Sequence, residues 1–241
     1  MFKTSVAAAI SLAAFMLSAQ ANAAPVTQCG PTICYTYDDA QAAVAEFGQP
    51  TFVGDLVRFL PPSFRAQSDD GVAQSNPAIS RDTATANFIF DDVYTLSGAD
   101  IGFIRVVEAG DYEIINGGDI SVDLYLQASN NNDFFDLTTA TNSFDAVGDS
   151  GGLQRWQLDA IIRPLVDQSD ILGTPWLSSN SLALNIQNTL TAYTDENGET
   201  AWVQKKITLA VSEVPVPAAV WLFGSGLGLL GFLRRRKPGV Q

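Results

Sequence analysis

Apolar and polar residues alternate along much of the middle of the chain, and this pattern predicts β-strands. In residues 120–129, Val122, Leu124 and Leu126 alternate with polar neighbours, as in a sheet that has one face in water. Segments rich in β-branched and aromatic residues occupy residues 86–96, 100–110, 111–116, 153–163, 181–194 and 200–214. Short antiparallel strands at this spacing predict an all-β fold, a single antiparallel β-sandwich or jelly roll over residues 24–213.

Turn-forming residues separate these segments at residues 97–98, 116–119 and 195–198. The last of these contains an Asn-Gly pair, which supplies the positive φ angles of a tight hairpin turn. Only residues 38–48 have helical character, with an acidic start and a glycine at the end. Residues 129–152 are mostly polar, and we expect them to be rich in loops.

The first residues carry a different pattern, which predicts export. Lys3 precedes an apolar run at residues 6–17, and the small residues of "AQANAAP" follow. This order is typical of a signal peptide, here residues 1–23 with cleavage after Ala23 or, alternatively, after Ala21. The other interpretation is a buried N-terminal helix.

The end of the chain is apolar and then strongly basic. Residues 218–233 are apolar apart from Ser225, and as a helix they would extend about 24 Å, or close to a bilayer's thickness when counted from residue 214. Proline prevents such a helix from extending upstream. Four cations follow it, which favours the cytoplasm for that end of the chain: Arg234, Arg235, Arg236 and Lys237. We therefore expect a single transmembrane helix with the preceding domain outside the cell.

The tail resembles a known sorting signal. A proline-containing tetrapeptide, a short glycine-rich apolar segment and a terminal arginine cluster together resemble the PEP-CTERM signal over residues 214–237. The tetrapeptide consists of Val214, Pro215, Val216 and Pro217. It is similar to the Val-Pro-x-Pro variant, because valine replaces the central glutamate of Pro-Glu-Pro.

The resemblance implies a partner and a destination. The partner is an exosortase of an exopolysaccharide-producing Gram-negative bacterium, which cleaves near the tetrapeptide after transient anchoring in the inner membrane. The released domain then serves at the cell surface or in the extracellular matrix, with exopolysaccharide as a possible partner, as a structural or binding protein and not as an enzyme. Alternatives are a permanent anchor without processing, a calcium- or carbohydrate-binding lectin-like module, and a carboxylate-only glycosidase.

Charge and composition exclude several functions. The whole chain has a net charge of −13 and contains no histidine. Between residues 25 and 217, eight basic residues against 26 acidic ones give a net charge of −18, which disfavours binding to nucleic acid or anionic lipid. The absence of histidine excludes Ser-His-Asp and Cys-His catalysis and histidine-ligated zinc.

Two cysteines, Cys29 and Cys34, are separated by five positions in "CGPTIC". In an exported chain the oxidising compartment favours a disulfide between them, and Gly30-Pro31 offers the turn. A redox pair or a metal clip is the alternative.

Other candidate residues do not form a recognisable motif. Carboxylates for a glycosidase pair are numerous, and no spacing selects two of them: Asp111, Glu113, Asp119, Asp123, Asp133 and Asp136. Calcium, the one cofactor considered, would need hard oxygen ligands, either from Asp119 and Asp123 or from Asp145 and Asp149. Three tryptophans are either sugar-stacking platforms or core residues, and the core is favoured: Trp156, Trp176 and Trp202. We assign no catalytic residue and leave the location of any metal site open.

Overall fold

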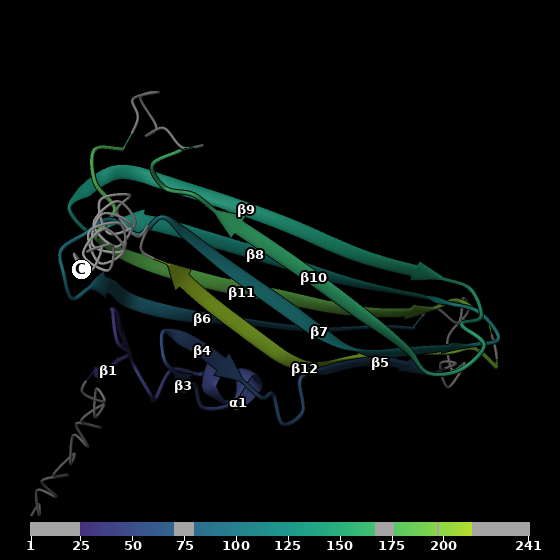
Figure 1. Ribbon diagram of the computed structural model, residues 1–241. Helices are drawn as coiled ribbons and strands as arrows, with labels where there is room; N and C mark the ends of the chain where they lie inside the picture. Colours follow the sequence, from purple (N-terminus) through teal and green to yellow (C-terminus); the bar gives the residue numbers. More distant parts are fainter. Residues whose placement is uncertain (1–24, 70–79, 167–175, 197, 214–241) are drawn as a thin grey trace, which may run out of the picture.

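The described part of the chain is a β-sandwich of two antiparallel sheets. The computed structural model describes residues 25–69, 80–166, 176–196 and 198–213, and they form two six-stranded sheets packed face to face (Figure 1). The predicted all-β antiparallel sandwich is therefore confirmed. The predicted signal peptide and transmembrane helix lie outside the described residues. Within the described ranges, α1 (Ala43–Phe47) is the only helix, and no helix there could cross a bilayer.

Each sheet is built around long central strands. The first sheet has the order β1 (Val26–Cys29), β2 (Ile33–Tyr37), β6 (Ser80–Thr95), β11 (Ser181–Thr194), β8 (Asp119–Asn130) and β9 (Asp133–Val147). The second sheet has the order β10 (Gln154–Ile162), β7 (Phe103–Ile115), β12 (Thr200–Glu213), β4 (Leu56–Phe59) and β3 (Thr51–Val53). In addition, β5 (Arg65–Asp69) pairs with the first half of β12.

Alternation along the strands places the core between the sheets. In β8 the apolar residues Val122, Leu124 and Leu126 are buried, as predicted, while Asp123 between them is exposed. The same alternation continues in β11, where Leu182, Leu184, Ile186 and Leu190 are buried. Since successive side chains of a strand point to opposite faces, these rows meet the buried rows of the second sheet.

The stretch predicted to be rich in loops is mostly a strand. Residues 133–147 form β9, which pairs with β8 from Asp119↔Val147 to Ser129↔Leu137. The expectation of loops was wrong because polarity was taken as a loop signal. Threonine is a good strand former, and the exposed face of an outer sheet accepts polar side chains.

Residues 100–110 and 111–116, predicted as separate segments, lie almost wholly in one strand, β7. Gly110 lies within this strand, where a glycine is normally unfavourable. A Cβ atom at this position would come within 1.9 Å of the Gln204 carbonyl oxygen and 2.7 Å of the Trp156 indole nitrogen. The glycine therefore makes room for the buried indole, and the strand continues through it.

The N-terminal part of the domain contains strands that the pattern did not predict. β1 to β5 all lie between residues 26 and 69, and the predicted helix at residues 38–48 is reduced to α1. Asp38 accepts a hydrogen bond from the Ala40 amide at 2.8 Å just before the helix, and Gly48 ends it with a φ of 79°. Phe47 of α1 packs against Phe59 and Phe88, with ring centroids 5.5 and 5.9 Å away.

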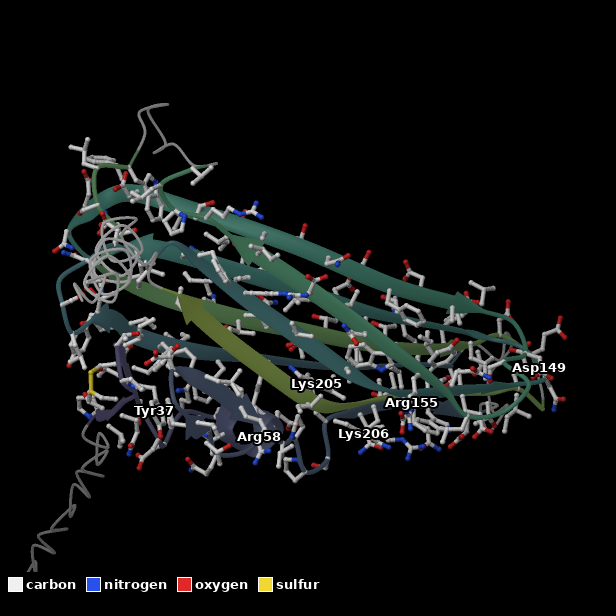
Figure 2. All side chains as sticks on the ribbon, in the orientation of Figure 1. Tyr37, Arg58, Asp149, Arg155, Lys205 and Lys206 are labelled. Carbon is white, nitrogen blue, oxygen red and sulfur yellow. A yellow bond between two sulfur atoms is a disulfide. The ribbon has the colours of Figure 1, made fainter. Side chains whose placement is uncertain are left out.

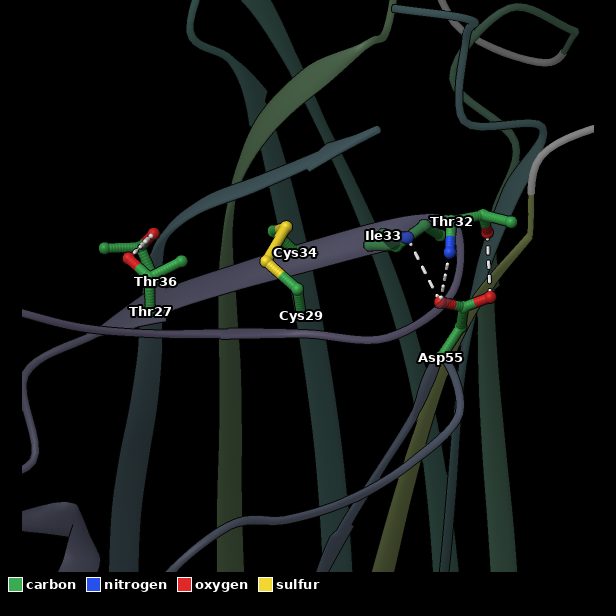
Figure 3. The surroundings of a disulfide bond; sticks show 7 residues. All are labelled: Thr27, Cys29, Thr32, Ile33, Cys34, Thr36 and Asp55. Atoms are coloured by element: carbon green, nitrogen blue, oxygen red, sulfur yellow. Dashed lines mark hydrogen bonds between the residues drawn. A yellow bond between two sulfur atoms is a disulfide. The ribbon is translucent and has the colours of Figure 1, made fainter. Parts of the chain in front are cut away.

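Asp55 ties the β3–β4 turn to the β1–β2 hairpin. Its Oδ1 atom accepts hydrogen bonds from the amides of Thr32 at 3.0 Å and Ile33 at 3.1 Å, and its Oδ2 accepts one from the Thr32 hydroxyl at 2.7 Å (Figure 3). One carboxylate thus satisfies three donors of the β1–β2 turn.

Replacing Asp55 by alanine should lower the free energy of unfolding by about 1–3 kcal/mol, because the two amides lose a charged acceptor. Asp55→Asn keeps the size and one acceptor, so we expect an intermediate loss. Equilibrium urea unfolding of the two variants and the wild type measures this. Equal stability of Asp55→Ala and the wild type would show that water replaces the carboxylate at no cost.

Candidate functional site

The residues of the predicted sorting signal follow directly on the last strand. β12 ends at Glu213, so Val214, the first residue of the tetrapeptide, is the next residue of the chain. The tetrapeptide itself and the basic residues 234–237 lie outside the described residues, and their role stays a prediction.

The predicted disulfide is present. Cys29 and Cys34 are direct cross-strand partners in β1 and β2, with Cα atoms 4.0 Å apart and their sulfur atoms bonded (Figure 3). The Gly30 amide donates to the Ile33 carbonyl at 2.8 Å and closes the turn between them. Both sulfurs are used in this bond, so neither is available as a metal ligand.

The structure distributes the carboxylates proposed for a glycosidase pair over both sheets, with Asp111 and Glu113 two residues apart on β7. Asp111 pairs with Lys206 on the outer face of the second sheet, and Glu113 accepts a hydrogen bond from the Trp202 indole at 3.3 Å. Asp136 lies on β9, near the end of β8, where it is buried and accepts a hydrogen bond from Asn130 at 2.8 Å. The remaining members of the set lie on strands of the first sheet: Asp119, Asp123 and Asp133.

The aspartates proposed for calcium are distributed over two strands and a turn, and Asp119 and Asp145 line the same depression. Asp119 and Asp123 are four residues apart on β8, which corresponds to about 13 Å along an extended strand, too far to share one ion. Asp145 on β9 is opposite Ser121 on β8. Asp149, in the turn after β9, accepts a hydrogen bond from the Gly151 amide. Among the described residues, no three acidic or cysteine side chains come together as a metal site.

Two of the three tryptophans belong to the core, as favoured by their sequence context. Trp156 is 2% exposed and Trp176 is 4% exposed. Trp202 is only partly buried, and the Arg65 guanidinium carbon lies 4.5 Å from its ring centroid. The indole is therefore covered by an arginine on the outer face of the second sheet.

The exposed face of the first sheet carries rows of uncharged polar side chains. One row crosses four strands through Asn87, Gln187, Tyr125 and Thr141, which are consecutive partners in the register of β6, β11, β8 and β9. None of the four is buried. Hydroxyl and amide groups at regular strand spacing can donate to and accept from the hydroxyl groups of a polysaccharide.

This face is hollowed between β8 and β9. A depression of about 370 Å³ is lined by Asp123, Tyr125, Thr141 and Ser143. The Tyr125 hydroxyl donates to the Gln127 side chain at 3.3 Å, which holds the phenol ring along the sheet. The sequence signal for this surface was the Thr- and Ser-rich stretch that we took for loops.

A second depression lies on the outer face of the second sheet. It has a volume of about 440 Å³, and its polar lining consists of Asp111, Arg155, Gln157 and Lys206. Lys206 is the extra residue at the irregularity in the pairing of β12 with β7. Ordinary alternation buries Lys205 and exposes Lys206 (Figure 2), and after the irregularity the buried positions shift to Thr208 and Ala210.

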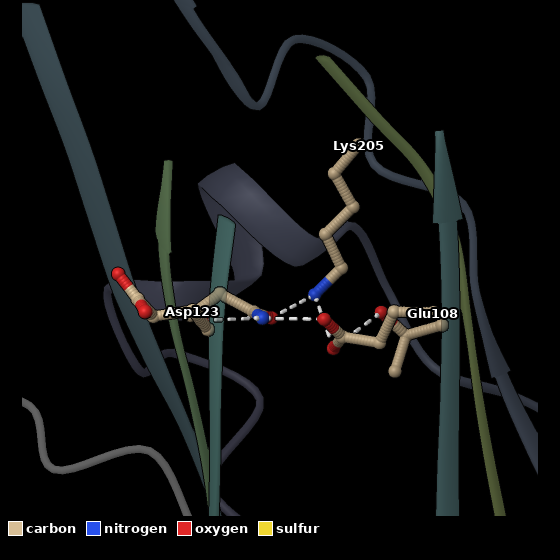
Figure 4. Close-up of polar contacts among 5 residues, drawn as sticks. Glu108, Asp123 and Lys205 are labelled. Atoms are coloured by element: carbon tan, nitrogen blue, oxygen red, sulfur yellow. Dashed lines mark hydrogen bonds and ion pairs between the residues drawn. The ribbon is translucent and has the colours of Figure 1, made fainter. Parts of the chain in front are cut away.

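Four polar residues from both sheets meet inside the sandwich, and we call them the interior polar cluster: Glu108, Asn188, Lys205 and Thr208. All four have 0% exposure. The Lys205 ammonium donates to Glu108 Oε1 at 2.7 Å and to Asn188 Oδ1, and the Asn188 amide donates to Glu108 Oε2 (Figure 4). The Thr208 hydroxyl donates to Glu108 Oε1 at 3.3 Å.

Burial dominates the electrostatics of this cluster. It lowers the pKa of Lys205 to about 8, although the nearby Glu108 carboxylate acts in the opposite direction. The Lys205 nitrogen also lies 3.9 Å from the centre of the Phe47 ring. Sequence analysis did not predict this cluster. Lys205 lies two residues after Val203, on the same face of the strand, and this spacing could have predicted that Lys205 is buried.

Comparisons with known proteins give little additional information. No protein-family model matches the chain, and none of the curated proteins matches it. One solved structure that matches is the carbohydrate-binding module TmCBM61 in complex with beta-1,4-galactotriose, at 13% sequence identity and a TM-score of 0.19. The match covers 69% of this chain and 90% of that chain. A similarity at this TM-score supports no inference about fold or ligand.

Proposed function

We propose that this chain is an exported structural or binding protein of the cell surface or the exopolysaccharide matrix, sorted and cleaved by an exosortase. The observation that carries the proposal is the tail, in which Val214, Pro215, Val216 and Pro217 precede an apolar segment and four terminal cations. An extended, proline-containing segment is a form that a protease cleft accepts. The chain is thus the substrate of the processing enzyme and not itself an enzyme.

Features of the folded domain support this destination. The Cys29–Cys34 disulfide is typical of an oxidising compartment outside the cytoplasm.

The strand order supports the expected jelly-roll topology, because β5–β12–β7–β10 in one sheet faces β6–β11–β8–β9 in the other. Such a domain with a strongly acidic surface would stay soluble in a hydrated matrix.

The mass of the protein recovered from its own host tests the proposal. We expect a species that ends near residues 214–217 and lacks Arg234 to Lys237. A Pro215→Ala/Pro217→Ala variant should keep the tail, whereas Pro62→Ala, at an exposed proline of the domain, should be processed normally. A wild-type protein that retains the four cations would refute processing and leave a permanent anchor.

Carbohydrate binding is a second candidate, favoured by the polar face of the first sheet. The rows of hydroxyl and amide groups around Tyr125 offer a contact surface for the matrix polysaccharide. A Tyr125→Ala/Thr141→Ala variant should lower affinity for the purified host exopolysaccharide at least about fivefold, which corresponds to the loss of one or two hydrogen bonds. Gln157→Ala, on the other sheet, should leave it unchanged. Equal retardation of all three proteins in polysaccharide-containing gels would refute this site.

A further inference from the structure

The interior polar cluster brings an amine, a carboxamide and a carboxylate into mutual contact. Lys205 Nζ contacts Asn188 Oδ1 and donates to Glu108 Oε1 at 2.7 Å, and Asn188 Nδ2 donates to Glu108 Oε2 (Figure 4). Each of the three side chains therefore touches the other two. They come from β12, β11 and β7, so both sheets contribute.

The amine is placed where its neutral, nucleophilic form is accessible. Lys205 and Glu108 are both fully buried, and burying an ion pair is costly. Transfer of one proton from the ammonium to the carboxylate leaves two neutral groups, which an apolar interior favours. Burial also lowers the pKa of Lys205, which makes its neutral form easier to reach than that of an exposed lysine.

The carboxamide is placed as the electrophile. The oxygen that Lys205 Nζ contacts is bonded to Asn188 Cγ, so the amine lies beside the carbonyl carbon. Asn188 Nδ2, the group that would leave, is held by Glu108 Oε2 and also donates to the Asp123 carbonyl at 3.3 Å. One carboxylate thus contacts both the nucleophile and the leaving group, as a general acid–base must.

We propose that Lys205 and Asn188 condense into an intramolecular isopeptide bond, with Glu108 as the proton carrier. A bond forms between Lys205 Nζ and Asn188 Cγ, the bond between Cγ and Nδ2 breaks, and ammonia leaves. Of the three protons on the Lys205 ammonium, one stays on the new amide. Glu108 carries the second to the departing nitrogen and keeps the third. No oxidant, metal or nucleotide takes part.

The surroundings suit this reaction. The rings of Phe47 and Phe64 lie 3.9 and 5.6 Å from Lys205 Nζ, and they exclude water that would compete for the carbonyl carbon. The strands hold the reacting groups in place, so the reaction needs no encounter step and gains the rate advantage of fixed proximity. Folding itself would assemble the site.

The bond would change how the domain resists unfolding. It would join consecutive strands of opposite sheets and close a loop whose ends are 17 residues apart. The two sheets could then not separate at their centre. Such a cross-link goes beyond the proposed sorting function and does not depend on it.

Mass spectrometry of the full chain tests the proposal. After reduction of the disulfide, we expect the wild type to be lighter than its sequence by about 17 Da, the mass of the ammonia released in the amine's attack on the carboxamide. A protease that cuts after glutamate separates the two residues at Glu196 and Glu199. The peptides that contain Asn188 and Lys205 should nevertheless remain joined.

Variants separate the bond from other sources of the same mass loss. Glu108→Gln keeps the size of the side chain but cannot take a proton, so we expect the full mass and separate peptides. Lys206→Met, next in the chain but exposed, should keep the joined peptides. The wild-type peptide map decides the question even where Glu108→Gln fails to fold. A full-mass wild type, or a loss that maps to the Asn-Gly pairs at residues 116–117 or 197–198, would overturn the proposal.

Discussion

Replacing Lys205 by methionine should lower the free energy of unfolding by about 3–5 kcal/mol relative to wild-type protein whose Lys205 amine is free, because it leaves Glu108 buried without its cation. The expected effect is large because both side chains of the pair are completely buried, 2.7 Å apart between Nζ and Oε1. Neither Asn188 nor Thr208, which donate to the same carboxylate, carries a positive charge. Equilibrium urea unfolding followed by tryptophan fluorescence measures the loss.

A double variant isolates the unpaired carboxylate. In Lys205→Met/Glu108→Leu both charges are gone, so we expect it to recover a large part of the loss seen in Lys205→Met. Both proteins lack the amine that the proposed isopeptide bond needs, and therefore the difference between them does not contain the effect of a cross-link. If the double variant is no more stable than the single one, the cost comes from packing and not from charge.

Lys206→Met is the matched control for the single variant. Lys206 precedes Ile207 on the same strand and pairs with Asp111, but its side chain is 55% exposed. Exposed ion pairs contribute about 0–1 kcal/mol. A loss well above this in Lys206→Met would show that any change at this irregular point of β12 disturbs the strand.

The fold class was readable from local patterns because burial in a two-layer sandwich alternates along each strand. β8 and β11 show this most clearly, since both are central strands with one face in the core. The same rule failed for β9, an edge strand of the first sheet whose exposed positions include Thr139, Thr141 and Ser143. Its strand character depends on pairing with β8, which no local window contains.

The candidate sites show the same division between local and long-range information. The Cys29–Cys34 bond was predictable because the two residues are five apart in a chain whose sequence predicts export. The interior polar cluster was not, since Glu108 is 80 residues from Asn188 and 97 from Lys205. Only the packing of one sheet on the other brings these groups together.

Replacing Phe88 by alanine should cost about 3–5 kcal/mol, the range for deleting a buried phenylalanine. Phe88 is fully buried in β6, and its ring centroid lies 4.6 Å from that of Phe59 and 5.1 Å from that of Phe90. It also contacts Phe47 of α1 and Tyr37 of β2, at 5.9 Å each. This ring therefore connects the first sheet to β4 and to the only helix in the described residues.

The neighbouring residue provides the control. Ile89 is 41% exposed on the opposite face of β6, and Gln41 bonds only to its backbone, so Ile89→Ala should cost less than about 1 kcal/mol. Phe88→Leu keeps most of the apolar volume and should cost less than Phe88→Ala. Urea unfolding of the three variants gives the order. A Phe88→Ala loss no larger than that of Ile89→Ala would mean that the N-terminal strands and α1 are not held on the sandwich by this aromatic cluster.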